Sequence, residues 1–167
     1  MGVVYLAEDT VLGREIALKI LNLLTNQDIA FADAFSREAR TVAALSHPNI
    51  IHINSFDVID GEFVIDMPYM AGGSLREKLG EGISVGGLVR IMCDTLSALG
   101  SCHDAGVVHR DIKPSNLLLA ADGSVRLADF GIARIMEEHW EAKTDQRTTT
   151  TLIGTPEYLA PEILRGL

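Results

Sequence analysis

Aromatic residues, cysteines and long apolar runs are all scarce in this sequence. Aromatics make up 5% of the 167 residues, and there are 2 cysteines. The apolar runs are only a few residues long, whereas a membrane-spanning helix needs about 20 residues, so we expect no transmembrane segment in this chain. The stretch from Met1 to Asp9 also lacks the basic start and apolar core of a secretory signal. We therefore expect no targeting segment here.

Basic residues are outnumbered by acidic ones. Lys and Arg total 14 against 23 Asp and Glu, which gives a net charge of −9. Nucleic acids and anionic membranes both select for clustered Lys and Arg, so neither is expected as the main partner. The apolar fraction of 47% is ordinary for a soluble globular domain that buries a core.

The two cysteines, Cys93 and Cys102, are nine residues apart in one expected helix. At 1.5 Å and 100° per residue they would lie on opposite faces, roughly 13 Å apart. That separation excludes a disulfide between them. Free thiols suit a reducing compartment, so we expect a cytoplasmic location.

The first seventy residues predict a small sheet that carries one helix. Residues 2–21 read as a hairpin around the turn from Asp9 to Gly13. A helical pattern follows, with apolar positions on one arc, and it stops before Pro48. Residues 50–56 and 63–67 read as two further strands joined at Asp60-Gly61.

The pattern changes after residue 70. A core helix with helical spacing is predicted and ends at Gly106; its apolar positions are Leu88, Ile91, Met92, Thr95, Leu96, Leu99 and Cys102. Short apolar runs at 107–108, 117–119 and 125–127 come next, and residues 137–151 read as an exposed loop. The fold class expected from this order of elements is α+β.

One segment concentrates chemically useful side chains. Residues 109–116 read HRDIKPSN and place an acid, Asp111, a cation, Lys113, and an amide, Asn116, within six residues. Thirteen residues beyond Asn116 comes Asp129, which begins the triplet DFG. These motifs resemble the HRDxKPxN catalytic loop and the DFG triplet of the eukaryotic-type Ser/Thr protein kinases, matched without substitution.

Three further features appear in the order that this family has. They are Ala17-Leu18-Lys19 in the second strand, Glu38 on the helix, and residues 154–162, which read GTPEYLAPE. The resemblance implies a two-lobed protein-kinase-like fold, with residues 1–70 as the sheet lobe and 71–167 as the first part of a mainly helical lobe. The style of the motifs looks most like bacterial members of the family.

The resemblance also implies roles for the motif residues. ATP would donate its γ-phosphoryl group, and Asn116 and Asp129 would supply the hard oxygen ligands that Mg²⁺ prefers. Asp111 would accept the proton of a substrate hydroxyl. Lys113 would meet the γ-phosphate, and it is typical of Ser/Thr rather than Tyr kinases.

Glu38 stands out on the helical wheel without reference to the family. It falls in the same arc as the apolar residues Phe35, Val42 and Leu45, so its carboxylate is expected to face the core. A carboxylate that faces a core needs a cationic partner. The resemblance supplies that partner as Lys19, held against the α and β phosphates. Taken alone, each of the two residues would more often be a surface charge.

Several apolar positions match the family's nucleotide pocket. The resemblance implies a lid glycine, a roof, a gatekeeper, a hinge and a floor around the adenine. The same residues would equally suit a plain core. Gly2 would be the lid glycine, Val4 and Ala17 the roof, Met67 the gatekeeper, Tyr69 and Met70 the hinge, and Leu118 the floor.

The polar stretch between Asp129 and Glu162 is where the resemblance places regulation. Arg110 and Arg134 match a cationic pocket for a phosphorylated loop, and Thr151, four residues before Thr155, occupies the usual phosphosite. A phosphate there would add about two negative charges and order the loop. A flexible solvated linker remains the alternative for a run of threonines.

The chain departs from the family pattern at both ends. Of the glycine-rich loop only the third glycine, Gly2, and Val4 are present, and the sequence stops five residues after Glu162. We therefore expect a kinase domain that is incompletely represented here.

The expected function is Mg²⁺-dependent transfer of phosphate from ATP to Ser or Thr of protein substrates, with self-association for trans-autophosphorylation as a further expectation. A small-molecule phosphotransferase is disfavoured by Lys113 and by the APE triplet of residues 160–162. A catalytically weak fragment that binds a nucleotide or a partner stays open as the alternative.

Overall fold

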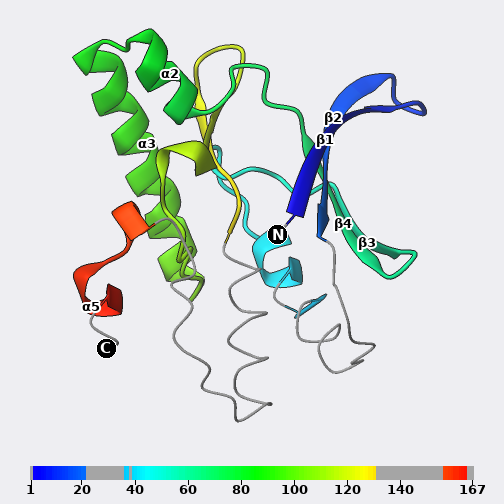
Figure 1. Cartoon of the computed structure of the whole chain (residues 1–167). Helices are drawn as coiled ribbons and strands as arrows, with labels where there is room; N and C mark the ends of the chain where they lie inside the picture. Colours follow the sequence, from blue (N-terminus) through cyan, green and yellow to red (C-terminus); the bar gives the residue numbers. More distant parts are fainter. Residues whose placement is uncertain (1, 22–35, 38, 131–155, 165–167) are drawn as a thin grey trace.

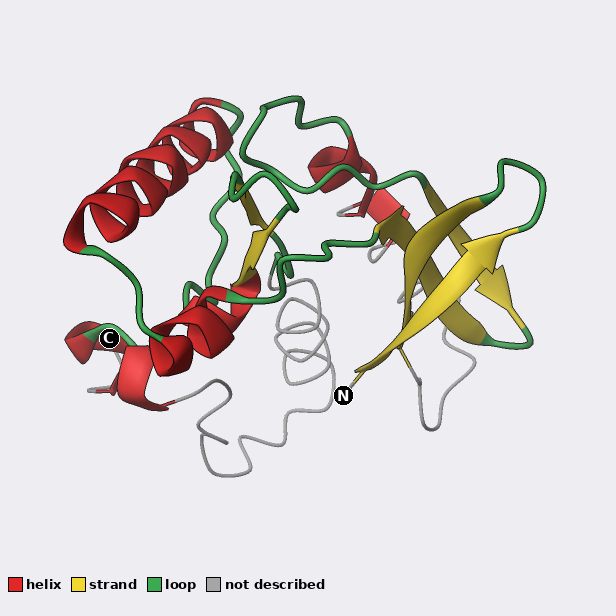
Figure 2. Ribbon diagram, turned by 90° about the horizontal axis from the view of Figure 1, so that it is seen from above, coloured by secondary structure: helices red, strands yellow, loops and turns green. Residues whose placement is uncertain are grey.

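The computed structural model describes residues 2–21, 36–37, 39–130 and 156–164. Figure 1 shows a twisted sheet on one side of the molecule and a mainly helical part on the other. Figure 2, seen from above, shows the same division, with loops passing between the two parts. The expected α+β fold with a sheet half and a helical half is confirmed.

The sheet has four antiparallel strands in the order β1-β2-β4-β3. These are β1 (Gly2–Asp9), β2 (Arg14–Leu21), β3 (Ser55–Ile59) and β4 (Glu62–Pro68). The turn between β1 and β2 forms because Asp9 Oδ1 accepts the backbone N–H groups of Val11 and Leu12, each at 3.1 Å. The hairpin predicted over residues 2–21 is confirmed.

The register of the sheet decides which side chains face the interior. Lys19 of β2 lies opposite Val4 of β1 and opposite Ile65 of β4. Ala17 lies opposite Met67 in the same way. Because side chains two residues apart share a face, these five residues lie on one face of the sheet.

The strand predicted over 50–56 was wrong at its start. Strand β3 begins only at Ser55 and runs on to Ile59. Residues 50 and 51 turn away from the sheet because they pair with another strand: Ile50 forms a parallel bridge with Leu127. The apolar residues at 50 and 51 do have an extended pairing partner, as the pattern predicted, but this partner is Leu127 and not a neighbouring strand of the sheet.

Two helices follow the sheet. Helix α2 (Leu75–Glu81) starts with a capping box, in which Glu77 N donates to Ser74 Oγ while Ser74 N donates to Glu77 Oε2 at 2.6 Å. Helix α3 (Val85–Asp104) is 20 residues long. It ends just before Gly106, whose φ of 73° suits a glycine.

The core face of α3 differs in part from the prediction. Its fully buried residues are Ile91, Thr95, Ala98 and Cys102. Met92 and Leu96 were expected in the core, but they are 43% and 62% exposed. The buried arc is narrower than the apolar pattern, because within the described residues only one side of α3 is covered by β6 and its neighbours.

A small second sheet contacts α2 and α3. Strands β5 (Leu117–Leu119) and β6 (Val125–Leu127) pair antiparallel, and the 3-10 turn η1 (Pro114–Asn116) leads into β5. The described part of the chain ends with η2 (Pro156–Tyr158) and the short helix α5 (Pro161–Leu164). Cys93 and Cys102 are free thiols, as expected.

A glycine pair ties the connection between the two halves to β5. Gly72 N donates to Leu119 O at 2.9 Å, and Leu119 N donates to Gly73 O at 2.8 Å. A Cβ on Gly72 would lie 2.6 Å from Leu119 O and 2.8 Å from Ala120 O. Only glycine permits this approach of two backbones.

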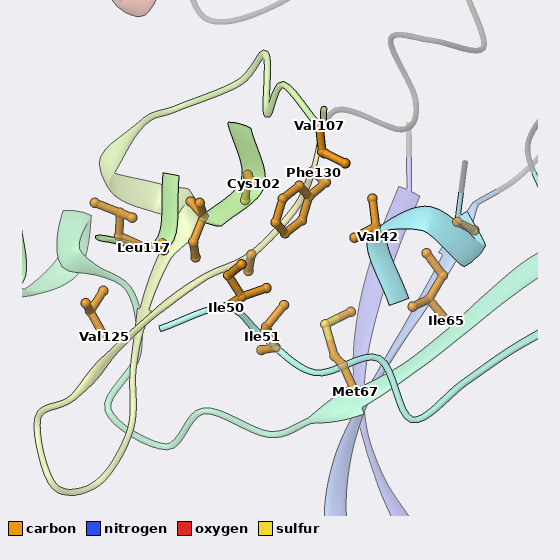
Figure 3. Close-up of a cluster of buried hydrophobic side chains, with 14 of the residues drawn as sticks. Val42, Ile50, Ile51, Ile65, Met67, Cys102, Val107, Leu117, Val125 and Phe130 are labelled. Carbon is orange, nitrogen blue, oxygen red and sulfur yellow. The ribbon is translucent and has the colours of Figure 1, made fainter. Parts of the chain in front are cut away.

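One continuous core runs through both halves. Buried side chains from β2, β4, helical residues 39–43, α3, β5 and β6 belong to the same cluster. Figure 3 shows Val42, Ile50, Ile51, Ile65, Met67 and Phe130 within it. None of the helices in the described part of the chain is both long and apolar enough to cross a bilayer.

We predict that Gly72→Ala destabilises the protein by about 1–3 kcal/mol, the usual cost of forcing a group into a filled space. Gly100→Ala is the matched control, because this glycine lies inside α3 and its added Cβ would meet nothing within 4 Å. The control should gain about 0.5–1 kcal/mol from reduced backbone entropy. Urea unfolding of both variants measures the difference, and equal effects would contradict the close approach at Gly72.

Candidate active site

Three separate segments bring the polar side chains together. The loop between α3 and β5 carries Asp111 and Lys113 and runs into η1, which ends at Asn116. The chain leaving β6 carries Asp129, and β2 carries Lys19. Residues that are far apart in the sequence therefore meet at the junction of the sheet half and the helical half.

Asp111 is held by two neighbours in its own loop. Its Oδ2 accepts from Lys113 Nζ at 2.7 Å and from Asn116 Nδ2 at 2.9 Å. Asn116 Nδ2 also donates to the backbone oxygen of Asp111 at 2.8 Å. Asn116 is 3% exposed, so its amide is a fixed support rather than a mobile surface group. The carboxylate of Asp111 is thereby oriented before any ligand binds.

Lys19 forms an ion pair with Asp129. The distance from Lys19 Nζ to Asp129 Oδ1 is 2.7 Å, and the two side chains are 18% and 39% exposed. The prediction paired Lys19 with Glu38, which lies outside the described residues. The contact with Asp129 was missed because nothing local in the sequence relates residues 110 positions apart.

Two residues of the site have left-handed backbones. Arg110 has φ of 67° and Asp129 has φ of 58°, a conformation that side chains other than glycine seldom adopt. Such strain persists only where the surroundings fix it. Here the buried side chain of His109 forms hydrogen bonds with the residue after Arg110 and with the residue before Asp129.

His109 braces the two strained positions at once. Its Nε2 lies 2.9 Å from Ala128 O, just before Asp129, and its Nδ1 accepts from Asp111 N at 3.3 Å, just after Arg110. Its ring also packs on Phe130, with 4.7 Å between the ring centroids. One neutral tautomer, with the proton on Nε2, satisfies both hydrogen bonds.

Burial lowers the pKa of His109 below the ordinary value for histidine, although the hydrogen bond to Ala128 opposes the shift. The side chain is 1% exposed. A second proton would have to go onto Nδ1, where it would face the N–H of Asp111. The neutral ring is therefore part of the folded site.

A cavity of about 120 Å³ lies between these groups. The polar residues on its wall are Lys19, Asp111 and Asp129, and the apolar ones are Leu21, Val42, Ile51, Ile53, Ile65, Met67 and Phe130. Of the residues expected in a nucleotide pocket, Lys19, Met67 and Asp129 line it. Its lining does not include Gly2, Val4, Ala17, Tyr69, Met70 or Leu118.

The remaining expected pocket residues do not line this cavity and lie at other positions. Val4 and Ala17 share the sheet face of Lys19 and Met67, as the register requires. Ala17, Met70 and Leu118 are partly buried against the core, and Tyr69 is 42% exposed. Arg110 is exposed in the loop that precedes η1. Glu38, Arg134, Thr151 and Thr155 lie outside the described residues.

We predict that the stability of the protein falls as the pH drops below about 6.5, the ordinary pKa of histidine. Since the pKa of His109 is lower in the folded state, the unfolded chain takes up a proton that the folded chain does not, and protonation favours unfolding. His109→Phe should be less stable at neutral pH and should lose this pH dependence. Urea unfolding between about pH 5 and pH 7.5 tests the sign; parallel losses in both proteins would contradict it.

Comparison with known proteins places this geometry in a family. The family model for the protein kinase domain matches residues 1–167. Probable serine/threonine-protein kinase PknB of Lactococcus lactis is 38% identical over 99% of this chain and 26% of its own length. Serine/threonine-protein kinase PrkC of Bacillus subtilis is 37% identical over 99% of this chain and 25% of its own length.

A solved structure agrees with the fold. The crystal structure of Rad53 in complex with AMP-PNP has a TM-score of 0.78 and 26% identity, over 98% of this chain and 39% of that one. The chain spans about a quarter of the length of the curated relatives named above. Domain match, sequence identity and fold together show that this chain belongs to the protein kinase family.

Proposed function

We propose that the chain carries the catalytic centre of a Ser/Thr protein kinase, which transfers the γ-phosphoryl group of ATP to Ser or Thr hydroxyls of proteins. The observation that carries the proposal is the convergence of Asp111, Asp129 and Lys19 on one cavity. Phosphoryl transfer needs mainly positioned charges of both signs, and these three groups supply them. Relatives named as serine/threonine-protein kinases support the same chemistry.

ATP is the proposed donor, and Lys19 is its proposed phosphate contact. Its side chain is 18% exposed and lines the cavity, where its ammonium group can exchange Asp129 for phosphate oxygens. The adenine would lie against the sheet face of Val4 and Ala17, with Gly2 at the lid. Tyr69 and Met70 would form the hinge, and Leu118 the floor. The structurally similar Rad53 was crystallised in complex with AMP-PNP, which supports a nucleotide as the ligand of this fold.

Mg²⁺ is the proposed cofactor, held by Asp129 and Asn116. Because Nδ2 of Asn116 donates to Asp111, the amide oxygen of Asn116 is the atom left for a metal. In the described ranges no group of three or more His, Cys, Asp or Glu residues is placed to hold a metal. The set still fits Mg²⁺, which is usually bound through one or two carboxylates together with substrate phosphates. The bound ion would neutralise charge on those phosphates.

Asp111 is the proposed base. It would accept the proton of the Ser or Thr hydroxyl while the hydroxyl oxygen bonds to the γ-phosphorus and the bond from that phosphorus to the β–γ bridging oxygen breaks. Lys113, 2.7 Å from Asp111, would stabilise the negative charge on the transferred group. The leaving ADP would carry the electron pair of the broken bond.

Regulation, partners and location extend the proposal. Phosphate on Thr151, or on Thr155, would be bound by Arg110 and Arg134, and self-association would allow one copy to modify another. Residues 1–70 and 71–167 would act as the two lobes. A cytoplasmic location agrees with the free thiols of Cys93 and Cys102.

We predict that Asp111→Asn lowers the rate of phosphate transfer by at least about 100-fold, which is the lower end of the usual contribution of a positioned base. The asparagine oxygen can still accept from Asn116, so the loop and nucleotide binding should be retained. Phosphate incorporation into casein and into the chain itself, with identification of the modified amino acid, measures the effect. A wild-type chain that binds ATP without any transfer would instead favour the alternative of a nucleotide-binding module.

A further inference from the structure

Two Asp-Gly pairs occur in the sequence, and both lie in hairpin turns. Asp60-Gly61 joins β3 to β4, and Asp122-Gly123 lies between β5 and β6. In such a pair the backbone nitrogen of the glycine can attack the side-chain carboxyl carbon of the aspartate, because glycine has no side chain to hinder the approach. The two turns hold these reacting groups in different ways.

The turn between β5 and β6 occupies both reacting groups. Gly123 N donates to Ala120 O at 2.9 Å, and Asp122 Oδ1 accepts from Ser124 N at 2.9 Å. Hydrogen bonds with the hydroxyl and the backbone N–H of Ser124 also lower the pKa of Asp122. A lower pKa leaves less of the neutral acid, which is the form that an attacking nitrogen can use. The fold therefore protects Asp122.

The turn between β3 and β4 leaves the same two groups unoccupied. Within the described residues, no group accepts a hydrogen bond from Gly61 N, and the carboxylate of Asp60 has neither a hydrogen-bond nor an ionic partner. Both residues are exposed. Figure 1 shows the turn at the outer end of the β3–β4 hairpin. No hydrogen bond has to break before Gly61 N can react.

The backbone of Asp60 favours opening of this turn. Asp60 has φ of 52° and Gly61 has φ of 81°, because a two-residue hairpin turn needs a left-handed backbone at both positions. Ring closure requires Asp60 to leave this conformation, so the turn must open first. Opening costs little here, since β3 is an edge strand of 5 residues and Ile59, which pairs with Glu62, is 54% exposed.

We propose that Asp60 is a site of spontaneous isoaspartate formation and that Asp122 is protected from it. Gly61 N bonds to Cγ of Asp60 and loses its proton, while one carboxyl oxygen leaves Cγ as water. A water molecule then opens the resulting cyclic imide. Where it cleaves the bond between Gly61 N and the main-chain carbonyl carbon, the chain runs on through Cγ, which is isoaspartate. The reaction uses no group of the catalytic site, so the proposal holds whether or not the chain binds ATP.

The modification lengthens the turn and disturbs the hairpin. Isoaspartate adds one methylene carbon to the main chain between two strands whose register is set across a two-residue turn. Val58 lies opposite Phe63 in that register. Phe63 is 0% exposed, and its ring stacks on Phe56 with 5.4 Å between the centroids. The modified protein is therefore less stable, because the pairing that buries Phe63 is strained.

Peptide mapping after prolonged warm incubation of the folded protein at neutral pH tests the site. Chromatography separates isoaspartyl peptides from aspartyl peptides of the same mass, and an imide peptide is lighter by one water. Isoaspartate should form about 10- to 100-fold faster at residue 60 than at residue 122, the factor expected for the two hydrogen bonds that hold only the second pair. In urea, where these bonds are absent, the two pairs should react at similar rates.

Equal formation at both residues of the folded protein would overturn the proposal. A folded protein that forms none at residue 60, although the urea-treated chain does, would overturn it as well.

Asp60→Gly is the matched variant for the effect on stability, since glycine accepts the left-handed backbone and carries no carboxyl group. During incubation the urea midpoint of wild type should fall as isoaspartate accumulates at residue 60, whereas the midpoint of Asp60→Gly should stay constant. An unchanged midpoint in wild type that carries the modification would refute the strain in the hairpin.

Discussion

The ion pair between Lys19 and Asp129 is the central contact of the site, and other parts of the fold hold its two side chains in place. It joins β2 to the chain after β6 across 110 residues and connects the sheet half to the helical half. An ion pair this exposed adds little stability by itself, since solvent screens it. Its 2.7 Å geometry must therefore be fixed by other parts of the fold: the sheet register, the brace of His109 and the pairing of residues 49–51 with β6.

The same contact explains how the proposed chemistry would work. Lys19 and Asp129 neutralise each other, as do Lys113 and Asp111. In the proposed mechanism, a nucleotide brings phosphates for the two lysines and a metal for Asp129, so each charge exchanges one partner for another. Groups that are already fixed by the fold need little reorganisation during that exchange. This preorganisation of charged groups is the main source of electrostatic catalysis.

The sequence predicts the hairpins, helix α3 and the polar cluster of residues 109–116 because their signals are local. Turn residues such as Asp60-Gly61, helical spacing and the HRDIKPSN segment each lie within one window. Burial of α3 was predicted too widely, since Met92 and Leu96 are apolar yet exposed. The pairing of Ile50 with Leu127, the contact of Lys19 with Asp129 and the link from His47 to Ser97 depend on tertiary packing, which no local pattern records.

The dependence of ATP binding on Mg²⁺ and Asp129 tests the central claim most directly. Asp129→Asn suits this test because asparagine tolerates the left-handed backbone found there, with φ of 58°. Calorimetric titration should show that wild type binds ATP more tightly with Mg²⁺ than with a chelator, and that Asp129→Asn loses this difference. Equal Mg²⁺ dependence in the two proteins, or no ATP binding by wild type, would contradict the account.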